Sequence, residues 1–468
     1  MTLAAVVVFE RVLRFVAVVF VHMAADFRAD DQAGETADHR RLGAERGADR
    51  GAGRSPDQTA GPPFGRTTGG CGDRQQQYNE NRPDCEPAMT NERFHDAILL
   101  QKTGRQVAEP SKHVTAVIPI GFHPVTIAKD ALLPVKKMNL VTGGAGFIGS
   151  HLVALLRTRG QAVRVLDLKA PLEPCAGVEY RQGSITDREA VAAAVAGCTR
   201  VYHLAAMSGL WAADKKAFID VNERGTQNVL AAAQSAGVQR VVHTSTESIL
   251  IAMGRGRAPQ VVNEKTRWGA AEMAGAYCLG KWCAEQAALA AAAAGQDVVV
   301  VNPTVPVGPG DHWLTPPTRM MLGFLNGRLP GWIDSTLNLA DARDIALGHW
   351  LAAERGTAGR RYILGAHDVR LGDLVALLGR LSGRRMPRFE VPYPLAWMTA
   401  VCQEWLADHI THRPPAAPLA GVRLAGIPVR FDNRETRAAL GWQPRPLVAS
   451  LGDALADYGQ RGLLESAA

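Results

Sequence analysis

Hydrophobic and polar positions change their pattern along the chain at Met138. From there onward, short aliphatic runs alternate with longer Ala-rich stretches. Strands that alternate with helices in this way are typical of a parallel sheet covered on both faces. The pattern predicts strands at 138–142, 162–167, 177–181, 200–204, 239–244 and 297–302. It predicts helices at 147–159, 187–196, 214–236 and 275–295.

The predicted fold is therefore α/β, a Rossmann-type doubly wound parallel sheet over residues 138–303. After Pro303 the alternation loosens, and Pro and Trp become common. This change indicates a smaller substrate-binding lobe over 304–468, interleaved with the end of the sheet. We expect several Trp residues of this lobe to pack in a core, and the alternative is that they line an apolar pocket. They are Trp313, Trp332, Trp405 and Trp397, the last within 392–397.

Residues 1–137 differ from the rest of the chain. The stretch 33–91 is dense in Gly, Asp, Arg, Gln and Pro, and such a segment buries too little apolar surface to offset its ordering entropy. We expect residues 1–137 to form a disordered extension. Because Met138 directly precedes the first predicted strand, a misassigned translation start is one explanation for it.

The opening segment 4–23 is apolar enough to suggest a membrane span or a signal peptide. Glu10, Arg11 and Arg14 lie in its interior, and each is unfavourable by about 2.5 to 3.5 kcal/mol near a bilayer centre. No small-residue cleavage site of convincing form follows it. We therefore expect no membrane span.

The first predicted strand runs into a glycine-rich turn. Gly143, Gly146 and Gly149 recur every third residue, and Gly144, Gly146 and Gly149 also match the pattern G-x-G-x-x-G. Bare backbone at such a turn can approach a pyrophosphate while the next helix points its positive N-terminus at it. The turn predicts a dinucleotide site, and an ordinary glycine turn is the alternative interpretation.

Asp167 ends the second predicted strand, close to the offset of roughly 20 residues at which a carboxylate meets the adenosine ribose. A carboxylate there accepts hydrogen bonds from the 2'-hydroxyl and repels a 2'-phosphate. We therefore expect NAD in preference to NADP, although Lys169 could soften that preference. A plain turn former at a strand end is the alternative role for Asp167.

Tyr277 and Lys281 form the pattern Y-x-x-x-K in a predicted helix, and a spacing of four places both side chains on one face. A nearby ammonium favours the phenolate and is expected to lower the tyrosine pKa from its usual value near 10. Thr246, at the end of an earlier strand, offers a hydroxyl that can bind the same substrate oxygen. An ordinary amphipathic helix is the alternative for the Tyr and Lys pair.

Composition excludes several other functions. With 468 residues, 47% of them hydrophobic, the chain has the size and balance of a globular enzyme. Its net charge is +7, but Lys and Arg are scattered, so we expect no nucleic-acid partner. The seven Cys show no paired or zinc-like spacing, so we expect no metal and a reducing cytoplasmic location.

Seven motifs in order make the chain resemble the extended short-chain dehydrogenase/reductase family, also called the NAD-dependent epimerase/dehydratase family. The resemblance covers nearly all of 138–468. The motifs are Thr142 to Gly149, Asp167, Val201 to Ala206, Asn222 to Val229, Thr244 to Thr246, Tyr277 to Lys281, and Pro303 to Pro309. Within the family, the segments Asn302 to Pro309, Leu337 to Asp344 and Arg361 to Gly365 look most like the hopanoid-associated sugar epimerase and dihydroflavonol 4-reductase-like branch.

The resemblance implies roles for individual residues. Tyr277 would be the general acid/base, and Lys281 would bind the nicotinamide ribose and tune it. Thr246 would be the hydroxyl partner, and Asn222 would be a structural or proton-relay residue. His203 is expected to be a packed histidine at a strand end. The expected cofactor contacts are Gly143, Gly146, Phe147, Ile148, Gly149, Asp167, Ala205, Ala206, Lys281 and Pro303.

Four segments depart from the family pattern, one of them Ala340 to Arg343, which replaces the commoner Val-His-Val-Asp before Asp344. Ser184 replaces an Asp that usually contacts adenine, and Gly280 replaces the usual Ser before the catalytic Lys. Asn302 stands where nucleotide-sugar enzymes often have Arg. These departures weaken a nucleotide-sugar assignment more than they weaken NAD binding.

The leading hypothesis is an NAD-dependent oxidoreductase that transfers hydride at a secondary alcohol or ketone of a small-molecule substrate. The alternatives are a sugar epimerase that recycles its NAD and a catalytically silent NAD(H)-binding regulator on the same fold. By analogy with the family, the predicted helices at 214–236 and 275–295 would form a homodimer interface.

Overall fold

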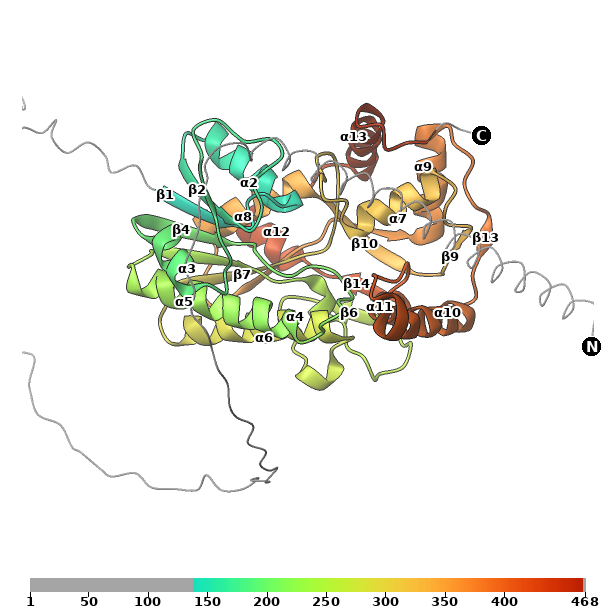
Figure 1. Ribbon diagram of the computed structural model, residues 1–468, viewed down its shortest axis with the longest axis horizontal. Helices are drawn as coiled ribbons and strands as arrows, with labels where there is room; N and C mark the ends of the chain where they lie inside the picture. Colours follow the sequence, from blue (N-terminus) through green and yellow to red (C-terminus); the bar gives the residue numbers. More distant parts are fainter. Residues whose placement is uncertain (1–137, 466–468) are drawn as a thin grey trace, which may run out of the picture. The chain divides into compact units, whose positions relative to one another are not determined.

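The computed structural model describes residues 138–465 (Figure 1). The expectations of a disordered extension over 1–137 and of no membrane span at 4–23 lie outside these described residues. Within them, no helix is long and apolar enough to cross a membrane.

A sheet of seven parallel strands forms the centre of the described fold, in the order β11-β7-β5-β4-β1-β2-β3. Its strands are β1 (Met138–Thr142), β2 (Ala162–Asp167), β3 (Glu179–Gln182), β4 (Cys198–His203), β5 (Arg240–Thr244), β7 (Val298–Pro303) and β11 (Arg361–Leu364). The order reverses its direction between β1 and β4, which is the switch point where such sheets bind ligands at the carboxyl ends of their strands. The predicted doubly wound fold is confirmed.

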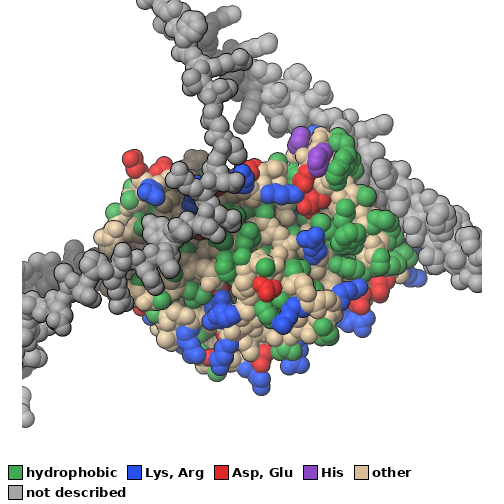
Figure 2. All heavy atoms as spheres, turned by 90° about the horizontal axis from the view of Figure 1, so that it is seen from below, with side chains coloured by type: hydrophobic (Ala, Val, Ile, Leu, Met, Phe, Trp, Pro, Cys, Tyr) green, Lys and Arg blue, Asp and Glu red, His purple; other side chains and the backbone are tan. Residues whose placement is uncertain are grey.

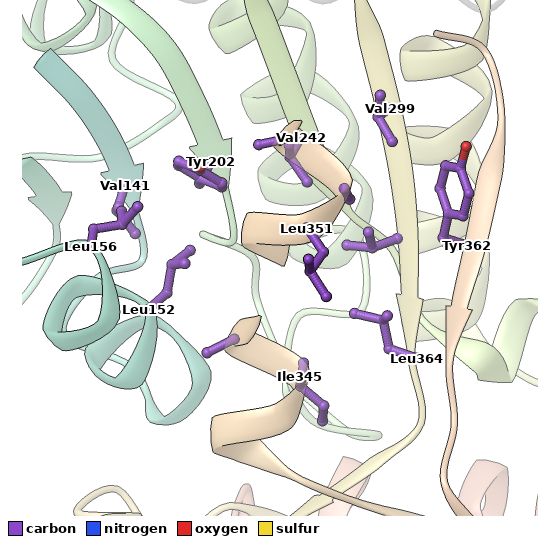
Figure 3. Packing of buried hydrophobic residues seen from close by; sticks show 14 of the residues in the cluster. Val141, Leu152, Leu156, Tyr202, Val242, Val299, Ile345, Leu351, Tyr362 and Leu364 are labelled. Carbon is purple, nitrogen blue, oxygen red and sulfur yellow. The ribbon is translucent and has the colours of Figure 1, made fainter. Parts of the chain in front are cut away.

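Helices cover both faces of this sheet (Figure 1). On one face, α2 (Phe147–Thr158) and α8 (Ala342–Arg355) pack on the strands. Their shared core includes Leu152, Ile345 and Leu351 against strand residues such as Val242 (Figure 3). The opposite face carries α3 (Arg188–Val195), α5 (Gly225–Ser235) and α6 (Ala276–Ala293). Neighbouring strand residues alternate between the two cores, as expected from the period of two in a strand.

The predicted elements and the observed ones agree closely over the first half of the fold. All six predicted strands are found with ends within two residues of the expected ones. The helix predicted at 214–236 consists of α4 (Ala217–Ile219), a π-helical turn η2 (Asp220–Arg224) and α5. The seventh strand, β11, was not predicted.

A second group of elements follows β7. The strands β8 (Val305–Val307), β10 (Thr336–Asp341) and β12 (His367–Arg370) form a small sheet in the order β12-β10-β8. Around it lie α7 (Pro316–Leu325), α9 (Leu371–Ser382) and α13 (Leu447–Gln460), whose apolar faces share one core. Between β10 and β12 the chain returns to the main sheet through α8 and β11, and α12 (Arg434–Leu440) packs near them.

The remaining elements are short or peripheral. They are η3 (Glu247–Leu250), β6 (Gln260–Val262), η4 (Ala270–Glu272), β9 (Gly331–Trp332), β13 (Phe389–Glu390), α10 (Tyr393–Leu406), η5 (Ala407–Thr411), α11 (Leu419–Ala425) and β14 (Val429–Phe431). β14 pairs with β6, and β13 pairs with β9. These pairings join distant segments near the carboxyl end of the main sheet.

The Trp residues of the second group do not all pack in a core. Trp332 packs on the core of α7, α9 and α13. Trp397, Met398 and Trp405 are exposed on α10. Figure 2 shows hydrophobic side chains gathered toward the right of the visible face. Core packing is therefore the wrong interpretation for Trp397 and Trp405.

Candidate active site

The glycine turn between β1 and α2 is held too tightly for side chains. Gly143 has φ +72°, and a Cβ there would lie 2.6 Å from the backbone nitrogen of Ala205. A Cβ on Gly149 would lie 2.1 Å from the carbonyl oxygen of Gly143. The first turn of α2 therefore packs directly on the end of β1, which leaves a bare backbone surface beneath the helix N-terminus.

The N-terminus of α2 offers backbone donors without a competing side chain. Gly146 is its N-cap residue and makes no side-chain cap. Phe147 is buried and Ile148 packs on the adjoining core, so these residues can contact a ligand through their backbone. The first amides of a helix lack partners within it and carry the positive end of its dipole. This arrangement suits a phosphate group.

Asp167 ends β2 beside the same turn. Its Oδ2 accepts a hydrogen bond from the Ala145 amide at 3.0 Å, and its Oδ1 accepts one from the Lys169 amide at 3.2 Å. The ammonium of Lys169 lies 4.1 Å from the ring centre of Trp313. Trp313 in turn donates from Nε1 to the Ala145 carbonyl at 2.8 Å. The carboxylate of Asp167 is thus fixed at the glycine turn. Trp313 contacts the same turn through the Ala145 carbonyl, a position that the sequence did not predict for it.

The end of β4 contributes His203, Ala205 and Ala206. His203 is fully buried, and its ring nitrogens lie 2.8 Å from Thr142 Oγ1 and 3.0 Å from Thr226 Oγ1. Burial lowers its pKa to about 3, so it stays neutral. The interpretation of His203 as a packed histidine agrees with these contacts. Ala205 donates its amide to Thr142 Oγ1 at 3.2 Å, which places the small residues beside Gly143.

Asn222 lies in the π-helical turn η2 and is buried. Its Oδ1 accepts a hydrogen bond from the Met207 amide at 2.7 Å, and its Nδ2 donates to the Met207 carbonyl at 3.2 Å. A single π-helical turn in a helix often marks a functional site. In the structure, Asn222 holds the loop that follows β4.

Tyr277 and Lys281 both come from the first two turns of α6. The Lys281 ammonium is buried and donates to the Thr244 carbonyl at 2.6 Å. Burial lowers the pKa of Lys281 to about 8, while the charge of Glu285 acts in the opposite direction. A Cβ on Gly280 would lie 2.5 Å from the Phe218 carbonyl oxygen, so this glycine lets α6 contact α4 closely.

The expected lowering of the Tyr277 pKa is wrong for this structure. Burial is the largest cause acting on the phenol and raises its pKa well above the usual value, and the charge of Glu247 acts in the same direction. Only the Thr246 hydroxyl lowers it. The physical reason is that the Lys281 ammonium is directed to the Thr244 carbonyl, so the phenol gains no counter-charge.

Thr246 is anchored from the opposite side by a buried polar network. Asn302 donates from Nδ2 to the Thr246 carbonyl at 3.1 Å and to Glu285 Oε2 at 2.8 Å. Glu285 pairs with Arg361, and both side chains are buried. Asn302 is therefore a positioning residue at the end of β7. Pro303 follows it, also buried, at the level of the Thr246 backbone.

Glu247 was not predicted as a site residue. Its Oε2 lies 2.9 Å from Thr246 Oγ1, and the side chain is half-buried. Loss of hydration raises its pKa to about 7. The sequence signal was an acidic residue directly after Thr246, but a carboxylate at a strand end is usually solvated.

A hollow of about 210 Å³ lies beside the N-terminal turn of α6. Phe218, which lines it, also meets the Tyr277 ring edge to face at 5.9 Å between ring centres. The hollow is mainly apolar, with three charged residues among those that line it. Its lining residues are Leu210, Trp211, Lys215, Phe218, Ala274, Gly275, Ala276, Glu404, Leu419, Ala420 and Arg423.

Two further observations concern metal binding and the position of Ser184. Across residues 138–465, no group of three or more His, Cys, Asp or Glu side chains is placed to hold a metal ion. Ser184, which replaces a family Asp, has its hydroxyl 2.7 Å from that of Thr186. The site therefore consists of a glycine turn, an acidic strand end and a Tyr, Lys and Thr group.

Comparison with known proteins supports the same interpretation. Residues 139–365 match the model of the NAD dependent epimerase/dehydratase family. The chain is 34% identical to "Putative dihydroflavonol 4-reductase" of Synechocystis sp., over 70% of this chain and 96% of that protein. It is 31% identical to Sterol demethylase protein B of Methylococcus capsulatus, over 70% of this chain and 99% of that protein.

Solved structures show the same fold. The crystal structure of gox2253 matches with a TM-score of 0.60 and 30% identity, over 70% of this chain and 100% of that one. UDP-glucuronic acid 4-epimerase from Bacillus cereus, in complex with UDP-glucuronic acid and NAD, matches with a TM-score of 0.55 and 20% identity. That match covers 69% of this chain and 99% of the epimerase.

Proposed function

The chain belongs to the NAD-dependent epimerase/dehydratase family of extended short-chain dehydrogenases/reductases, and we propose that Tyr277 is the acid/base of its reaction. The protein is an NAD-dependent oxidoreductase of this class. The substrate is a secondary alcohol or the corresponding ketone. The single observation that carries the assignment is the hydrogen bond of Lys281 to the Thr244 carbonyl at the end of β5, because it joins the helix that carries Tyr277 to the strand end that leads to Thr246.

The residues around the glycine turn fit NAD. A Cβ at Gly143 or Gly149 would collide with the backbone of Ala205 or of Gly143, so only glycine permits this close turn beneath the N-terminus of α2, whose amides point toward it. Phe147 and Ile148 would contribute their amides, with Ala205 and Ala206 lining the opposite side. When bound, NAD supplies the hydride acceptor at its nicotinamide ring.

Asp167 favours NAD over NADP. Its carboxylate is held at the turn by the Ala145 amide, where it would accept hydrogen bonds from a ribose 2'-hydroxyl and repel a 2'-phosphate. Lys169 is the cation that could offset this repulsion, but its ammonium lies over the Trp313 ring. Gly146 and Pro303 would complete the binding surface.

The reacting groups have separate tasks in this proposal. The Tyr277 phenol exchanges a proton with the substrate oxygen, and the Thr246 hydroxyl binds that oxygen. Lys281 holds the end of β5 through the Thr244 carbonyl and would bind the nicotinamide ribose. Asn222 keeps the loop after β4 in place through Met207.

The substrate class favoured by the site is an apolar alcohol or ketone. The hollow beside the N-terminal turn of α6 is lined mainly by apolar side chains, and one of them, Phe218, contacts the Tyr277 ring. Asn302 is buried and bound to Thr246 and Glu285, so it is not available to a nucleotide sugar. Among the relatives, Sterol demethylase protein B and a farnesyl dihydroquinoline oxide ketoreductase of Stigmatella aurantiaca have names that refer to apolar compounds.

Two alternatives remain open to test. A sugar epimerase would use the same Tyr277 chemistry but return the hydride to its substrate. A silent NAD(H)-binding regulator has no need of Thr246, Tyr277 and Lys281 together, and their presence in one site argues against it.

One experiment separates these three functions. The purified full chain is incubated anaerobically with NAD and a panel of steroid alcohols, flavonoid-like alcohols and nucleotide sugars, while NADH absorbance and product mass are followed. We expect NADH to accumulate with an apolar alcohol. An isomerised sugar without NADH would identify the epimerase, and NAD binding without any turnover would favour the regulator.

We also propose a homodimer located in the cytoplasm. α4, α5 and α6 lie side by side on one face of the fold (Figure 1), and they are the helices that resemble the family's dimer elements. Free cysteines among the described residues, such as Cys283 on α6 and Cys402 on α10, suit a reducing compartment. Light scattering coupled to size exclusion tests the dimer directly.

A further inference from the structure

Helix α10 has apolar side chains around its whole circumference. One side packs into a small core through residues such as Leu395 and Ala400, which are buried. On the opposite side, Trp397, Met398 and Trp405 are 42%, 52% and 55% exposed. A helix that is apolar all round is normally buried in protein or in lipid. The exposed side of α10 therefore indicates a surface that receives a partner.

The exposed apolar side chains of α10 form one continuous stripe. Trp397, Val401 and Trp405 follow each other at intervals of four residues, which places them in one row along a helix. Met398 lies beside this row, and Ile410, 61% exposed in η5, extends it. These five residues are called the apolar stripe. α10 lies at the outer edge of the fold, beside α11 (Figure 1).

The charges near the apolar stripe favour an anionic partner. Residues 384–430, which carry the stripe, include six Arg and three acidic residues. Two of the acidic side chains, Glu404 and Asp408, are bound by the Lys215 ammonium at 3.2 and 2.6 Å. Arg423, on the neighbouring helix α11, is exposed. The segment that carries the stripe therefore has a surplus of positive charge.

The chemistry of the apolar stripe suits a lipid bilayer better than a protein partner. A specific protein interface carries about ten hydrogen bonds, whereas the only polar side-chain groups of the stripe are the indole N–H groups of Trp397 and Trp405. Trp is enriched at membrane surfaces, because its apolar ring and its polar N–H match the boundary between acyl chains and headgroups. Anionic headgroups match the surplus of Arg.

The apolar stripe also borders the hollow beside α6. Glu404, which directly precedes Trp405 on α10, lines this hollow, as does Leu419 of α11. Phe218 lines the same hollow and contacts the Tyr277 ring. A bilayer in contact with the stripe would therefore lie next to the hollow in which an apolar substrate would bind.

We propose that the apolar stripe docks the protein on the surface of a bilayer that contains anionic phospholipid, and that the hollow takes up its apolar alcohol or ketone from that bilayer. The uptake rests on the proposed function, whereas the docking does not depend on it. In this arrangement α10 lies in the plane of the interface, with its stripe among the headgroups and upper acyl chains. It does not cross the bilayer.

The first test measures contact between the stripe and lipid. All nine Trp of the chain lie within 138–465, so quenching of Trp fluorescence by lipids brominated in their acyl chains reports on the described fold. The full chain is titrated with such vesicles, made of phosphatidylcholine and phosphatidylglycerol in equal parts. We expect quenching in the wild type and a loss of most of it in Trp397→Phe/Trp405→Phe, which keeps the stripe apolar. Unquenched wild-type fluorescence would overturn the proposal.

The second test measures affinity by flotation with the same vesicles. Trp397→Gln/Trp405→Gln should lower the partition coefficient at least about tenfold. The control Leu381→Gln/Val448→Gln changes two exposed apolar side chains on α9 and α13 and should leave the coefficient within about twofold of the wild type. Equal flotation of Trp397→Gln/Trp405→Gln and the wild type would show that another part of the chain binds the lipid, and would overturn the proposal.

Lipid composition tests the role of charge. Vesicles of phosphatidylcholine alone should bind the wild type at least about tenfold less tightly than vesicles that contain phosphatidylglycerol. Raised salt should weaken binding to the anionic vesicles, since it screens exposed charges. Equal affinity for both kinds of vesicle would contradict the proposed preference for anionic lipid.

A second copy of the chain is the alternative partner for the apolar stripe. Sedimentation velocity of the wild type and of Trp397→Gln/Trp405→Gln over a range of concentrations separates the two possibilities. We expect both proteins to have the same oligomeric state, because the proposed homodimer uses α4, α5 and α6. If association of the wild type were lost in the variant and vesicles left its Trp fluorescence unquenched, the stripe would bind another copy and the proposal would fail.

Turnover separates the uptake of substrate from the proposed function. The first panel alcohol that yields NADH is supplied either within the anionic vesicles or dispersed in a water-miscible solvent. Trp397→Gln/Trp405→Gln should raise the apparent KM for the vesicle-borne alcohol at least about tenfold and leave kcat for the dispersed alcohol within about twofold. An equal KM for the vesicle-borne alcohol would overturn uptake from the bilayer. If the wild type binds vesicles but oxidises no alcohol, the docking stands and the proposed function fails.

Discussion

The ammonium of Lys281 lies 2.6 Å from the backbone carbonyl of Thr244. This hydrogen bond joins α6 directly to the end of β5, so the helix that carries Tyr277 and the strand end that leads to Thr246 are held in one place. The arrangement explains why a lysine can be buried here. A carbonyl oxygen accepts a hydrogen bond from its ammonium, and the negative charge of Glu285 stabilises the ammonium. It also means that Lys281 positions the site in addition to any contact with NAD.

Replacing Lys281 by Met should therefore weaken both the fold and the reaction. The change leaves the Thr244 carbonyl without its buried donor, which costs about 1 to 3 kcal/mol, and turnover should fall at least about 100-fold. Urea unfolding and initial rates measure the two effects. Lys216→Met, at an exposed position, serves as the control and should change stability by less than about 0.5 kcal/mol. Wild-type stability for Lys281→Met would show that the hydrogen bond is not important.

The close approach of α2 to the glycine turn predicts a contrast between two helical glycines. Gly149→Ala should abolish NAD binding, because its Cβ would lie 2.1 Å from the Gly143 carbonyl oxygen and force the turn open. Gly452→Ala, in α13 with nothing within 4 Å of the added Cβ, should instead stabilise the protein by about 0.5 to 1 kcal/mol. Calorimetric titration with NAD and thermal unfolding test the pair. Normal NAD binding by Gly149→Ala would be incompatible with the described turn.

The position of Asp167 predicts the choice of cofactor. Asp167→Asn keeps an acceptor for the Ala145 amide but removes the charge, so affinity for NADP should rise at least about tenfold relative to NAD. Dissociation constants from fluorescence quenching by NADH and NADPH give this ratio. The exposed Asp214→Asn is the control. An unaltered ratio in Asp167→Asn would place the adenosine ribose elsewhere.

The buried ion pair between Glu285 and Arg361 should be important for stability. Arg361→Met leaves the Glu285 charge unpaired in the interior, which costs about 3 to 5 kcal/mol. Arg434→Met breaks the exposed pair with Asp432 and should cost at most about 1 kcal/mol. Guanidinium unfolding of the two variants compares them. If the two variants lost similar amounts of unfolding free energy, burial would not explain the importance of the pair between Glu285 and Arg361.

Much of the fold followed from the sequence because a strand period of two and an Ala-rich helical stretch leave clear patterns. The turn at Gly143 to Gly149 was predictable since only glycine tolerates that backbone approach. β11 was missed because it is four residues long and begins with the charged Arg361, and it lies after Pro303, where the alternation of strands and helices loosens. Asp167 and Tyr277 could be selected from their spacing alone.

The electrostatics of the site could not be predicted in the same way. The spacing of Tyr277 and Lys281 correctly placed them on one helix, but the direction of the ammonium depends on the Thr244 carbonyl, which comes from a different element. Glu247 was overlooked since a sequence gives no measure of hydration, and its loss is what raises the pKa of this carboxyl. Asn302 could be noted from the sequence only as a departure from the family's Arg, because its contacts with Thr246 and Glu285 depend on the fold.

The central claim is that Tyr277 transfers the proton in an NAD-dependent hydride transfer. It is tested most directly by comparing Tyr277→Phe with the wild type, using the first panel substrate that turns over and calorimetry of NAD binding on both proteins. We predict that the variant binds NAD within about twofold of the wild type and loses at least about 100-fold in kcat. Equal turnover in the two proteins would contradict the claim and remove Tyr277 from the mechanism.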